Sequence, residues 1–225
     1  MKIAIDGPAG AGKSTIARRL AQELGFVYVD TGAMYRALTW KALRQGIPLD
    51  DPQSLAQLAL QTRIRFSYTS NGQKVWCDDM DVTDSIRSPE VTARVSQLAS
   101  HRQVRSILVA MQREMAKSES VVMDGRDIGE CVLPDAEYKF FLTATLEERA
   151  RRRAREMNIP CDADRLLQLE KEIMERDEND SAREVGALRV LDDSIIIDTS
   201  YMQADEVLAS VLNIVKEAGG ALQNN

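Results

Sequence analysis

The chain has 225 residues, of which 44% are hydrophobic and 28% are charged. This near-average composition excludes a disordered tail protein, a collagen-like fibre and a low-complexity linker. The formal net charge of −6 argues against a broad surface for binding polyanions, although it permits a local basic pocket.

Short apolar runs alternate with helical patterns along the chain. The runs are mostly β-branched or aromatic and lack polar alternation, which is typical of strands covered on both faces. The five expected strands are residues 3–6, 26–30, 121–124, 138–143 and 194–198. The expected helices are residues 15–24, residues 104–116, a helix opened by a capping box at 145–148, and residues 204–218, which should stop at Gly219-Gly220. This alternation predicts an α/β fold with a five-stranded parallel sheet and helices on both faces.

Two stretches depart from the alternation. Residues 63–68 alternate polar and apolar side chains, and Asn71-Gly72 separates them from a second run at 74–77, which predicts a β-hairpin inserted between the second and third sheet strands. Residues 147–183 are dense in both charge signs and are interrupted near Pro160, which predicts two charged helices around a mobile connection. The last residues, 221–225, are expected to fray.

The strongest motif is Gly7-Pro-Ala-Gly-Ala-Gly12-Lys13-Ser14, which matches G-x-x-x-x-G-K-[ST] between an expected strand and an expected helix. Glycines let backbone N–H groups turn towards phosphates, and the following helix adds the positive end of its dipole. Lys13 supplies a charge for the β- and γ-phosphates, and the Ser14 hydroxyl is a ligand for Mg²⁺. The motif therefore predicts a nucleoside triphosphate site at Gly7, Pro8, Ala9, Gly10, Ala11, Gly12, Lys13, Ser14 and Thr15.

The motif does not say what happens to the nucleotide. The chain has no Asn-Lys-x-Asp run for reading guanine, and it is short for a motor or a large ATPase. A small-molecule kinase and a nucleotide-dependent binding module remain as alternatives.

A second anion site is predicted at the carboxyl ends of two strands. Arg36 follows the second expected strand and Arg126 follows the third, at the sheet edge where ligands bind in doubly wound folds. Two guanidinium forks near a phosphate-binding loop suit another doubly charged phosphate, although each arginine alone could form a surface ion pair. Asp124 ends the third strand and either holds the water shell of Mg²⁺ or caps a helix.

Cysteine usage and hydropathy indicate the compartment. Cys77, Cys131 and Cys161 are far apart, as expected in a reducing environment, and the amino terminus becomes polar too early for a signal peptide. No apolar run approaches the roughly 20 residues that span a bilayer. With aromatic residues at 5%, a platform for stacking nucleic-acid bases is not expected. We expect a cytoplasmic monomer that binds small molecules rather than membranes or nucleic acid.

With these residues placed, the sequence resembles the bacterial cytidylate kinases, which are nucleoside monophosphate kinases, over essentially its whole length. The resemblance rests on Ile5-Asp-Gly-Pro-Ala-Gly-Ala-Gly-Lys-Ser14, Asp30-Thr-Gly-Ala-Met-Tyr-Arg36, Asp124-Gly-Arg-Asp-Ile-Gly129 and Glu175-Arg-Asp-Glu-Asn-Asp-Ser-Ala-Arg183. It implies a P-loop NTPase core at 1–35, 104–150 and 184–225. It also implies a monophosphate-binding region at 36–103, with the antiparallel β insertion near 63–83, and a helical lid at 151–183.

The resemblance also implies roles for individual residues. Those implied for the acceptor are Arg36, Arg126 and Arg183 at its phosphate, Ser96, Arg105 and Asp127 at the cytosine edge, Asp180 at the ribose, and Thr31, which keeps the hydroxyl of the more usual serine. Those implied for catalysis are Lys13, Asp124, Arg176 and Arg183. Taken without the resemblance, Ser96 and Arg105 would be surface positions on helices and Asp127 would be a turn cap.

The expected reaction is transfer of the γ-phosphoryl group of MgATP to CMP or dCMP, with Mg²⁺ accompanying ATP and no tightly held organic cofactor. A related kinase acting on UMP, AMP or dTMP is the nearer alternative, and a module that senses ATP without turnover is the more distant one. The arginines between residues 149 and 155 are expected to form a solvated, ion-paired face with one or two contacts to ATP.

Overall fold

The computed structural model describes residues 1–69 and 72–222, with side chains described through residue 217 outside that gap. The chain divides into two compact units, Met1–Tyr28 with Ser118–Asn225, and Val29–Lys117. Each unit is built around its own apolar cluster.

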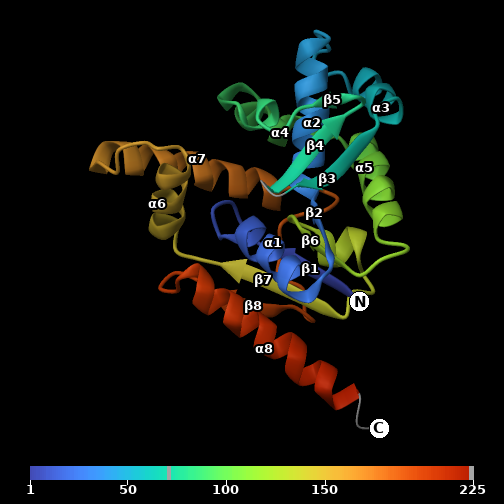
Figure 1. Ribbon diagram of the computed structural model, residues 1–225. Helices are drawn as coiled ribbons and strands as arrows, with labels where there is room; N and C mark the ends of the chain where they lie inside the picture. The colour runs from blue at the N-terminus through green and yellow to red at the C-terminus, as the bar shows by residue number, and fades with distance from the viewer. Residues whose placement is uncertain (70–71, 223–225) are drawn as a thin grey trace. The chain divides into compact units, whose positions relative to one another are not determined.

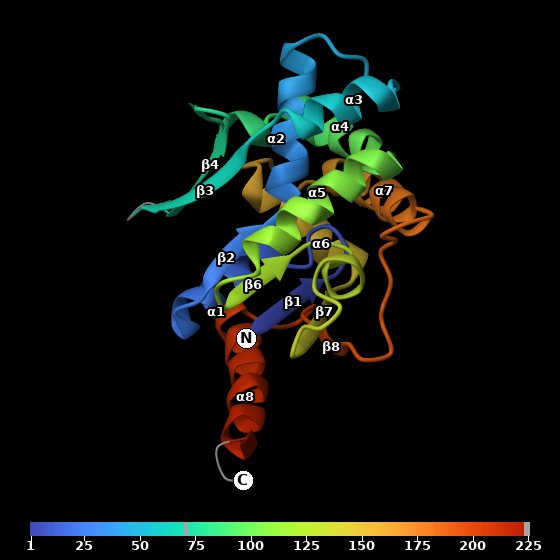
Figure 2. The same ribbon diagram turned by 90° about the vertical axis from the view of Figure 1, so that its right-hand side faces the viewer.

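The first unit contains most of a five-stranded sheet with the order β2-β6-β1-β7-β8 (Figures 1 and 2). The central strand β1 pairs in parallel with β6 and β7, so that Ile3 lies opposite Val122 on one side and Tyr138 on the other. The strands are β1 (Lys2–Asp6), β2 (Val27–Asp30), β6 (Val121–Asp124), β7 (Tyr138–Thr143) and β8 (Ile195–Asp198). All five strands predicted from apolar runs are confirmed to within one residue at each end. The prediction succeeds because a parallel strand buried on both faces forms a continuous apolar run in the sequence.

Helices follow the strands of this unit. They are α1 (Lys13–Leu24), α6 (Leu146–Glu156), α7 (Ala163–Ser181) and α8 (Ala204–Leu222), with a short helical turn at Ile128–Val132. Helices α1 and α8 contact each other and share an apolar cluster with β1 and β7, to which Leu20, Phe140 and Val211 contribute. Helices α6 and α7 also lie against each other (Figure 1), as the two charged helices predicted from the sequence.

The prediction that the last helix stops at Gly219-Gly220 is wrong, because α8 continues to Leu222. Glycine lowers helix stability by about 1 kcal/mol but does not forbid helical backbone angles. The predicted fraying concerns residues 221–225, of which 223–225 lie outside the described part of the chain.

The capping box at the start of α6 forms only in part. The Thr145 side chain accepts a hydrogen bond from the Glu148 amide at 3.4 Å. The Thr145 amide donates instead to Ser200 Oγ at 2.8 Å, and the Glu148 carboxylate pairs with Arg152. A neighbouring loop has therefore taken the place of the reciprocal bond.

The second unit combines four helices with a small antiparallel sheet. The helices are α2 (Thr31–Arg44), α3 (Pro52–Leu60), α4 (Pro89–Ser100) and α5 (Arg102–Met115), with a 3₁₀ turn at Ser85–Arg87. The strands are β3 (Ile64–Thr69), β4 (Gly72–Cys77) and β5 (Met80–Asp81), in the order β3-β4-β5. The predicted hairpin is confirmed, with Ile64 opposite Cys77, whereas the expected turn residue Asn71 lies outside the described residues.

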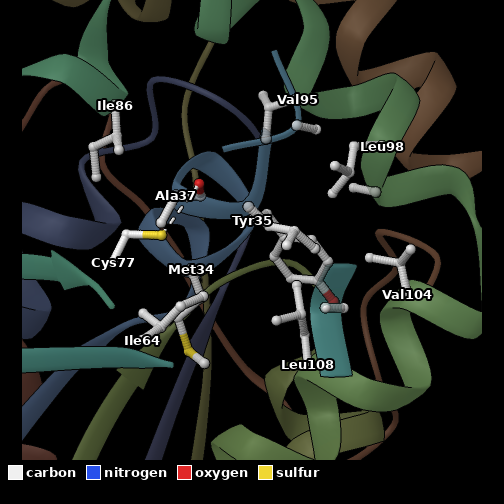
Figure 3. Packing of buried hydrophobic residues seen from close by; sticks show 14 of the residues in the cluster. Met34, Tyr35, Ala37, Ile64, Cys77, Ile86, Val95, Leu98, Val104 and Leu108 are labelled. Atoms are coloured by element: carbon white, nitrogen blue, oxygen red, sulfur yellow. Dashed lines mark hydrogen bonds between the residues drawn. The ribbon is translucent and has the colours of Figure 1, made fainter. Parts of the chain in front are cut away.

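The core of the second unit gathers side chains from all its helices and from β3 and β4. Figure 3 shows Met34, Ile64, Leu98 and Leu108 among them. Within the described residues, no helix is long and apolar enough to cross a membrane.

Candidate active site

The loop between β1 and α1 requires glycine where it approaches other parts of the first unit. Gly7 has a φ of +145°, and a Cβ there would lie 2.0 Å from the Leu142 carbonyl oxygen of β7. Gly12 has a left-handed backbone and precedes α1 directly, so the helix N-terminus opens at the end of the loop. This is the geometry that the phosphate-binding motif predicts.

Lys13 is the first residue of α1 and is only 6% exposed. Its Nζ donates a hydrogen bond to the Pro8 carbonyl oxygen at 2.7 Å. Burial, together with the positive charge of Arg126, lowers the pKa of Lys13 to about 7. Asp124 and Asp6 offset these effects only in part, so the ammonium charge would gain from an anionic ligand.

Asp124, at the end of β6, contacts the loop from the adjacent strand. Its carboxylate accepts hydrogen bonds from Ser14 Oγ at 2.7 Å and from the Tyr28 hydroxyl at 2.9 Å. The parallel register places Ile5 opposite Asp124, which explains why the ends of β1 and β6 meet at one edge. These bonds place the Asp124 carboxylate directly beside the hydroxyl of Ser14.

Asp6 organises the loop that follows β6. Its two carboxylate oxygens accept hydrogen bonds from the backbone amides of Ile128 and Gly129, each at 2.8 Å. Burial raises the pKa of Asp6 to about 6, although both amide bonds act in the opposite direction. Asp6 was given no role from the sequence, although it lies within the stretch Ile5–Ser14 that carries the resemblance.

Arg126 and Arg183 form an ion-pair cluster around the buried Asp180 within the first unit. Asp180 is 1% exposed, and its carboxylate pairs with Arg126 Nε at 2.8 Å and with the Arg183 guanidinium. Burial alone would raise the pKa of Asp180, but Arg126 and Arg183, with Arg176, hold it below its ordinary value. Arg126 therefore pairs with a buried carboxylate rather than with one on the surface.

The arginines of α6 separate into two groups. Arg149 and Arg152 face the rest of the unit: Arg149 donates to the Ala9 carbonyl oxygen, and Arg152 donates to Thr199. The other three pair with glutamates of the same helix, as a solvated face would; they are Arg151, Arg153 and Arg155.

The second unit holds the other residues that the resemblance assigns to the acceptor. Arg36 Nη1 donates to Thr92 Oγ1 at 2.9 Å, Thr31 begins α2 and is buried, and Ser96 is half-buried on α4. Arg105 is 3% exposed and its guanidinium lies 5.6 Å from the centre of the Tyr35 ring. The interpretation of Arg105 as a solvated helix residue is therefore wrong, because the helix turns it inwards.

Within the first unit, the structure brings together Ser14 with Asp124, and Arg126 with Asp180 and Arg183. Asp127 is buried in the loop that Asp6 holds. Besides Asp6, the sequence analysis also missed Asp177, which accepts a hydrogen bond from the Ala9 amide. Asp177 lies within the stretch Glu175–Arg183 that carries the resemblance, but that stretch does not show which of its carboxylates reaches the phosphate-binding loop.

Comparisons with known proteins agree with this arrangement. The family model described as "Cytidylate kinase" matches residues 3–217. The chain is 55% identical over 216 residues to a cytidylate kinase of Desulforamulus reducens, and 50% identical over 218 residues to one of Shouchella clausii, covering 96% of each protein.

Among solved structures, an uncharacterized protein from Eubacterium ventriosum matches 96% of this chain and 98% of its own with a TM-score of 0.51 at 14% identity, which supports the fold alone. Since the family model spans nearly all residues and the curated relatives share about half of them, the chain belongs to the cytidylate kinase family.

Proposed function

We propose that this protein transfers the γ-phosphoryl group of ATP, with Mg²⁺, to CMP or dCMP. The observation that carries the proposal is that one unit holds a phosphate-binding loop together with the ion-pair cluster of Arg126 and Arg183 around the buried Asp180. Membership of the cytidylate kinase family supports the same reaction. A module that only senses ATP would not need the cluster of Arg126, Asp180 and Arg183.

The donor side would be formed by residues 7–15. The N-terminal amides of α1 and the loop amides would bind the phosphates of ATP, and Lys13 would leave the Pro8 carbonyl for the β- and γ-phosphates. The lowered pKa of Lys13 supports this assignment, because a phosphate supplies the missing negative charge.

The oxygen donors beside the loop fit magnesium. Ser14 Oγ and the Asp124 carboxylate lie 2.7 Å apart, and both are hard ligands of the kind Mg²⁺ prefers. Ser14 would bind the metal directly, and Asp124 would hold it through a water molecule. When bound with ATP, Mg²⁺ supplies charge neutralisation for the phosphates.

The acceptor side is assigned from the resemblance and from the contacts of each residue. Arg36, Arg126 and Arg183 would bind the monophosphate, and Asp180 would bind a ribose hydroxyl while keeping two of these guanidinium groups in place. The residues proposed to read the cytosine edge are Ser96, Arg105 and Asp127, with Thr31 as a further acceptor contact. A polar group left unpaired by the wrong base costs about 1–3 kcal/mol, so each of these residues would discriminate against bases that cannot pair with it.

The reaction requires little beyond positioning and charge neutralisation. Two anions must approach in line, so the protein has to offset their repulsion, and no protein base is needed to activate a phosphate oxygen. Arg176 on α7 is proposed to contact the transferring group. Closure of the lid would bring this arginine into place and exclude water as a competing acceptor.

Replacing Arg176 with alanine should lower kcat steeply, since an arginine at the transferring phosphoryl is worth about 10³–10⁵ in rate. The KM for CMP should change much less. Steady-state kinetics would measure both, with the exposed Lys171→Ala on the same helix as a control for loss of one positive charge. Near wild-type turnover by Arg176→Ala would remove this residue from the mechanism.

A coupled assay for ADP tests the function itself. ADP should form only when CMP or dCMP is added to ATP and Mg²⁺, and kcat/KM should be lower for UMP, AMP and dTMP. A preference for another monophosphate would assign the chain a different acceptor, and ATP binding without ADP formation would favour a sensing module. We further propose that the enzyme is a cytoplasmic monomer, in keeping with Cys77 and Cys161, which form no disulfide.

A further inference from the structure

Two side chains from the helices that follow β7 form hydrogen bonds to one residue of the phosphate-binding loop. The Ala9 amide donates a hydrogen bond to Asp177 Oδ1 on α7 at 3.1 Å, and the Ala9 carbonyl oxygen accepts one from Arg149 Nη1 on α6 at 3.1 Å. Arg149 Nη1 also pairs with Asp177 Oδ2, which closes a ring of three residues. Both backbone polar groups of Ala9 are therefore bound by side chains from outside the loop.

The ring fixes the peptide to which Lys13 is bound. The Pro8 carbonyl and the Ala9 amide belong to the same planar peptide unit. Lys13 Nζ holds the oxygen of this unit at 2.7 Å, while Asp177 holds its N–H. Any rotation of the peptide that frees the N–H from Asp177 would also move the carbonyl that orients Lys13.

The contact between α6 and the loop leaves little space for adjustment. A Cβ at Gly10 would lie 3.0 Å from both Arg149 Cβ and the Arg149 carbonyl oxygen. Arg149 Nε donates to the Ala144 carbonyl oxygen at 3.1 Å, so the guanidinium is anchored at a further point. The Arg149 and Asp177 side chains are only 11% and 17% exposed, so solvent screens this pair less than it would screen an exposed one.

The charge of Asp177 argues against a simple electrostatic role in binding nucleotide. A carboxylate beside a loop that binds phosphates repels a polyphosphate through space. If charge were all that mattered, neutralising Asp177 would strengthen ATP binding. A favourable contribution of Asp177 must therefore come from the geometry that it imposes on Ala9 and Arg149.

We propose that Asp177 is a positioning residue for ATP, which acts by fixing the Pro8–Ala9 peptide and by holding Arg149 against the phosphate-binding loop. The inference rests on the proposed function, in which the phosphates of ATP bind this loop. It assigns to α7 a second task beside that of Arg176, because the same helix would set the resting shape of the donor site.

The test compares Asp177→Asn, Asp177→Ala and a control, Glu172→Gln, which removes one negative charge from an exposed position on the same helix. ATP affinity is measured by titration calorimetry, and kcat and both KM values by steady-state kinetics. Asp177→Ala should weaken ATP binding about tenfold, the loss typical of one charge-assisted hydrogen bond. Asp177→Asn should weaken it less, about threefold, since its amide oxygen can still accept the Ala9 N–H.

The KM for CMP should stay within about twofold of wild type in both variants, and Glu172→Gln should behave as wild type. Arg149→Lys keeps the positive charge but lacks the fork that bridges Ala9, Ala144 and Asp177, so it should repeat the ATP defect. The double variant Asp177→Ala/Arg149→Lys should be little worse than either single change, because each residue acts through the other. Thermal unfolding checks that every variant folds. If Asp177→Ala does not fold, the nearly isosteric Asp177→Asn alone tests the positioning role.

The outcomes separate this inference from the proposed function. A wild-type protein that binds no ATP would overturn the proposed function. A wild-type protein that binds ATP, with Asp177→Asn binding equally or more tightly, would overturn the positioning role and leave the proposed function intact. Equal rises in the KM for ATP and for CMP would likewise overturn it, since they would indicate a general loss of structure.

Discussion

At the scale of single residues, Asp6 is buried where its negative charge is energetically unfavourable but its carboxylate can bind two backbone amides. Its carboxylate joins the end of β1 to the loop that carries Arg126 and Asp127, through the amides of Ile128 and Gly129. Full burial makes ionisation unfavourable, and the pKa rises from 3.8 to about 6. Asp6 therefore contributes order to the loop at the expense of stability near neutral pH.

Asp6→Asn tests this through the pH dependence of stability. Between about pH 4 and pH 6 the folded protein retains a proton on Asp6 that the unfolded chain has released, so this group makes the free energy of unfolding fall as pH rises. The asparagine variant lacks that contribution. The stability of wild type relative to Asp6→Asn should therefore fall by about 1 kcal/mol between about pH 5 and pH 7.

Urea unfolding at the two pH values measures this difference. The asparagine variant also alters the hydrogen bonds to the loop, which shifts its free energy of unfolding by a constant amount at every pH. Only the change of the stability difference with pH therefore tests the titration of Asp6. Wild-type and variant stabilities that run parallel over this range would show that Asp6 does not titrate there.

At the scale of elements, the close approach of α6 to the phosphate-binding loop depends on a residue without a side chain. Gly10 has a φ of +77°, and its Cα faces the backbone of Arg149. Two independent penalties would therefore follow from a methyl group at this position. One comes from the left-handed backbone and the other from the collision with α6.

Gly10→Ala should lower the free energy of unfolding more than Gly46→Ala does. Gly46 has a similar φ of +65° but no atom within 4 Å of its would-be Cβ, so its substitution reports the backbone penalty alone, about 1–2 kcal/mol. Forcing atoms into the contact at Gly10 should add about 1–3 kcal/mol. Chemical denaturation of both variants measures the two free energies of unfolding. Equal losses of stability would mean that α6 moves away from the added methyl group at no energetic cost.

At the scale of the whole molecule, the two units divide the residues of the proposed reaction. The phosphate-binding loop, Lys13 and Asp177 all belong to the first unit, whereas Arg36 and Arg105 belong to the second. Each unit has its own apolar cluster, so we expect the two units to respond separately to a ligand.

ATP alone should therefore slow amide hydrogen exchange in the loop and in α6, and leave the core helices α2 and α5 of the second unit almost unchanged. Ligand binding suppresses the local openings through which amides exchange. CMP should slow exchange in α5 as well, since Arg105 is proposed to contact it. Mass-spectrometric exchange with each nucleotide separately measures this, and protection of α5 by ATP alone would contradict the division.

Local sequence signals account for much of the fold. The strands were predicted because parallel strands buried on both faces form continuous apolar runs, as in β6, where every residue is buried. Helix α2 was missed because its buried residues surround the helix rather than forming one stripe. Helix α3 was also missed, although Asp51 and Pro52 form an N-terminal signal and the Asp51 side chain does cap it.

The donor half of the proposed site could be predicted without a structure, since the phosphate-binding motif is contiguous and each of its residue types has a local physical reason. Which carboxylates contact the phosphate-binding loop and the loop after β6 is visible only in the folded chain. Asp6 bonds to an amide 122 positions away, and Asp177 to one 168 positions away, and no local pattern encodes partners at such separations. A charged residue on a helix has the same local sequence signature whether it faces water or another element. Only the fold shows that Asp177 and Arg105 turn towards the protein, where their side chains are 17% and 3% exposed.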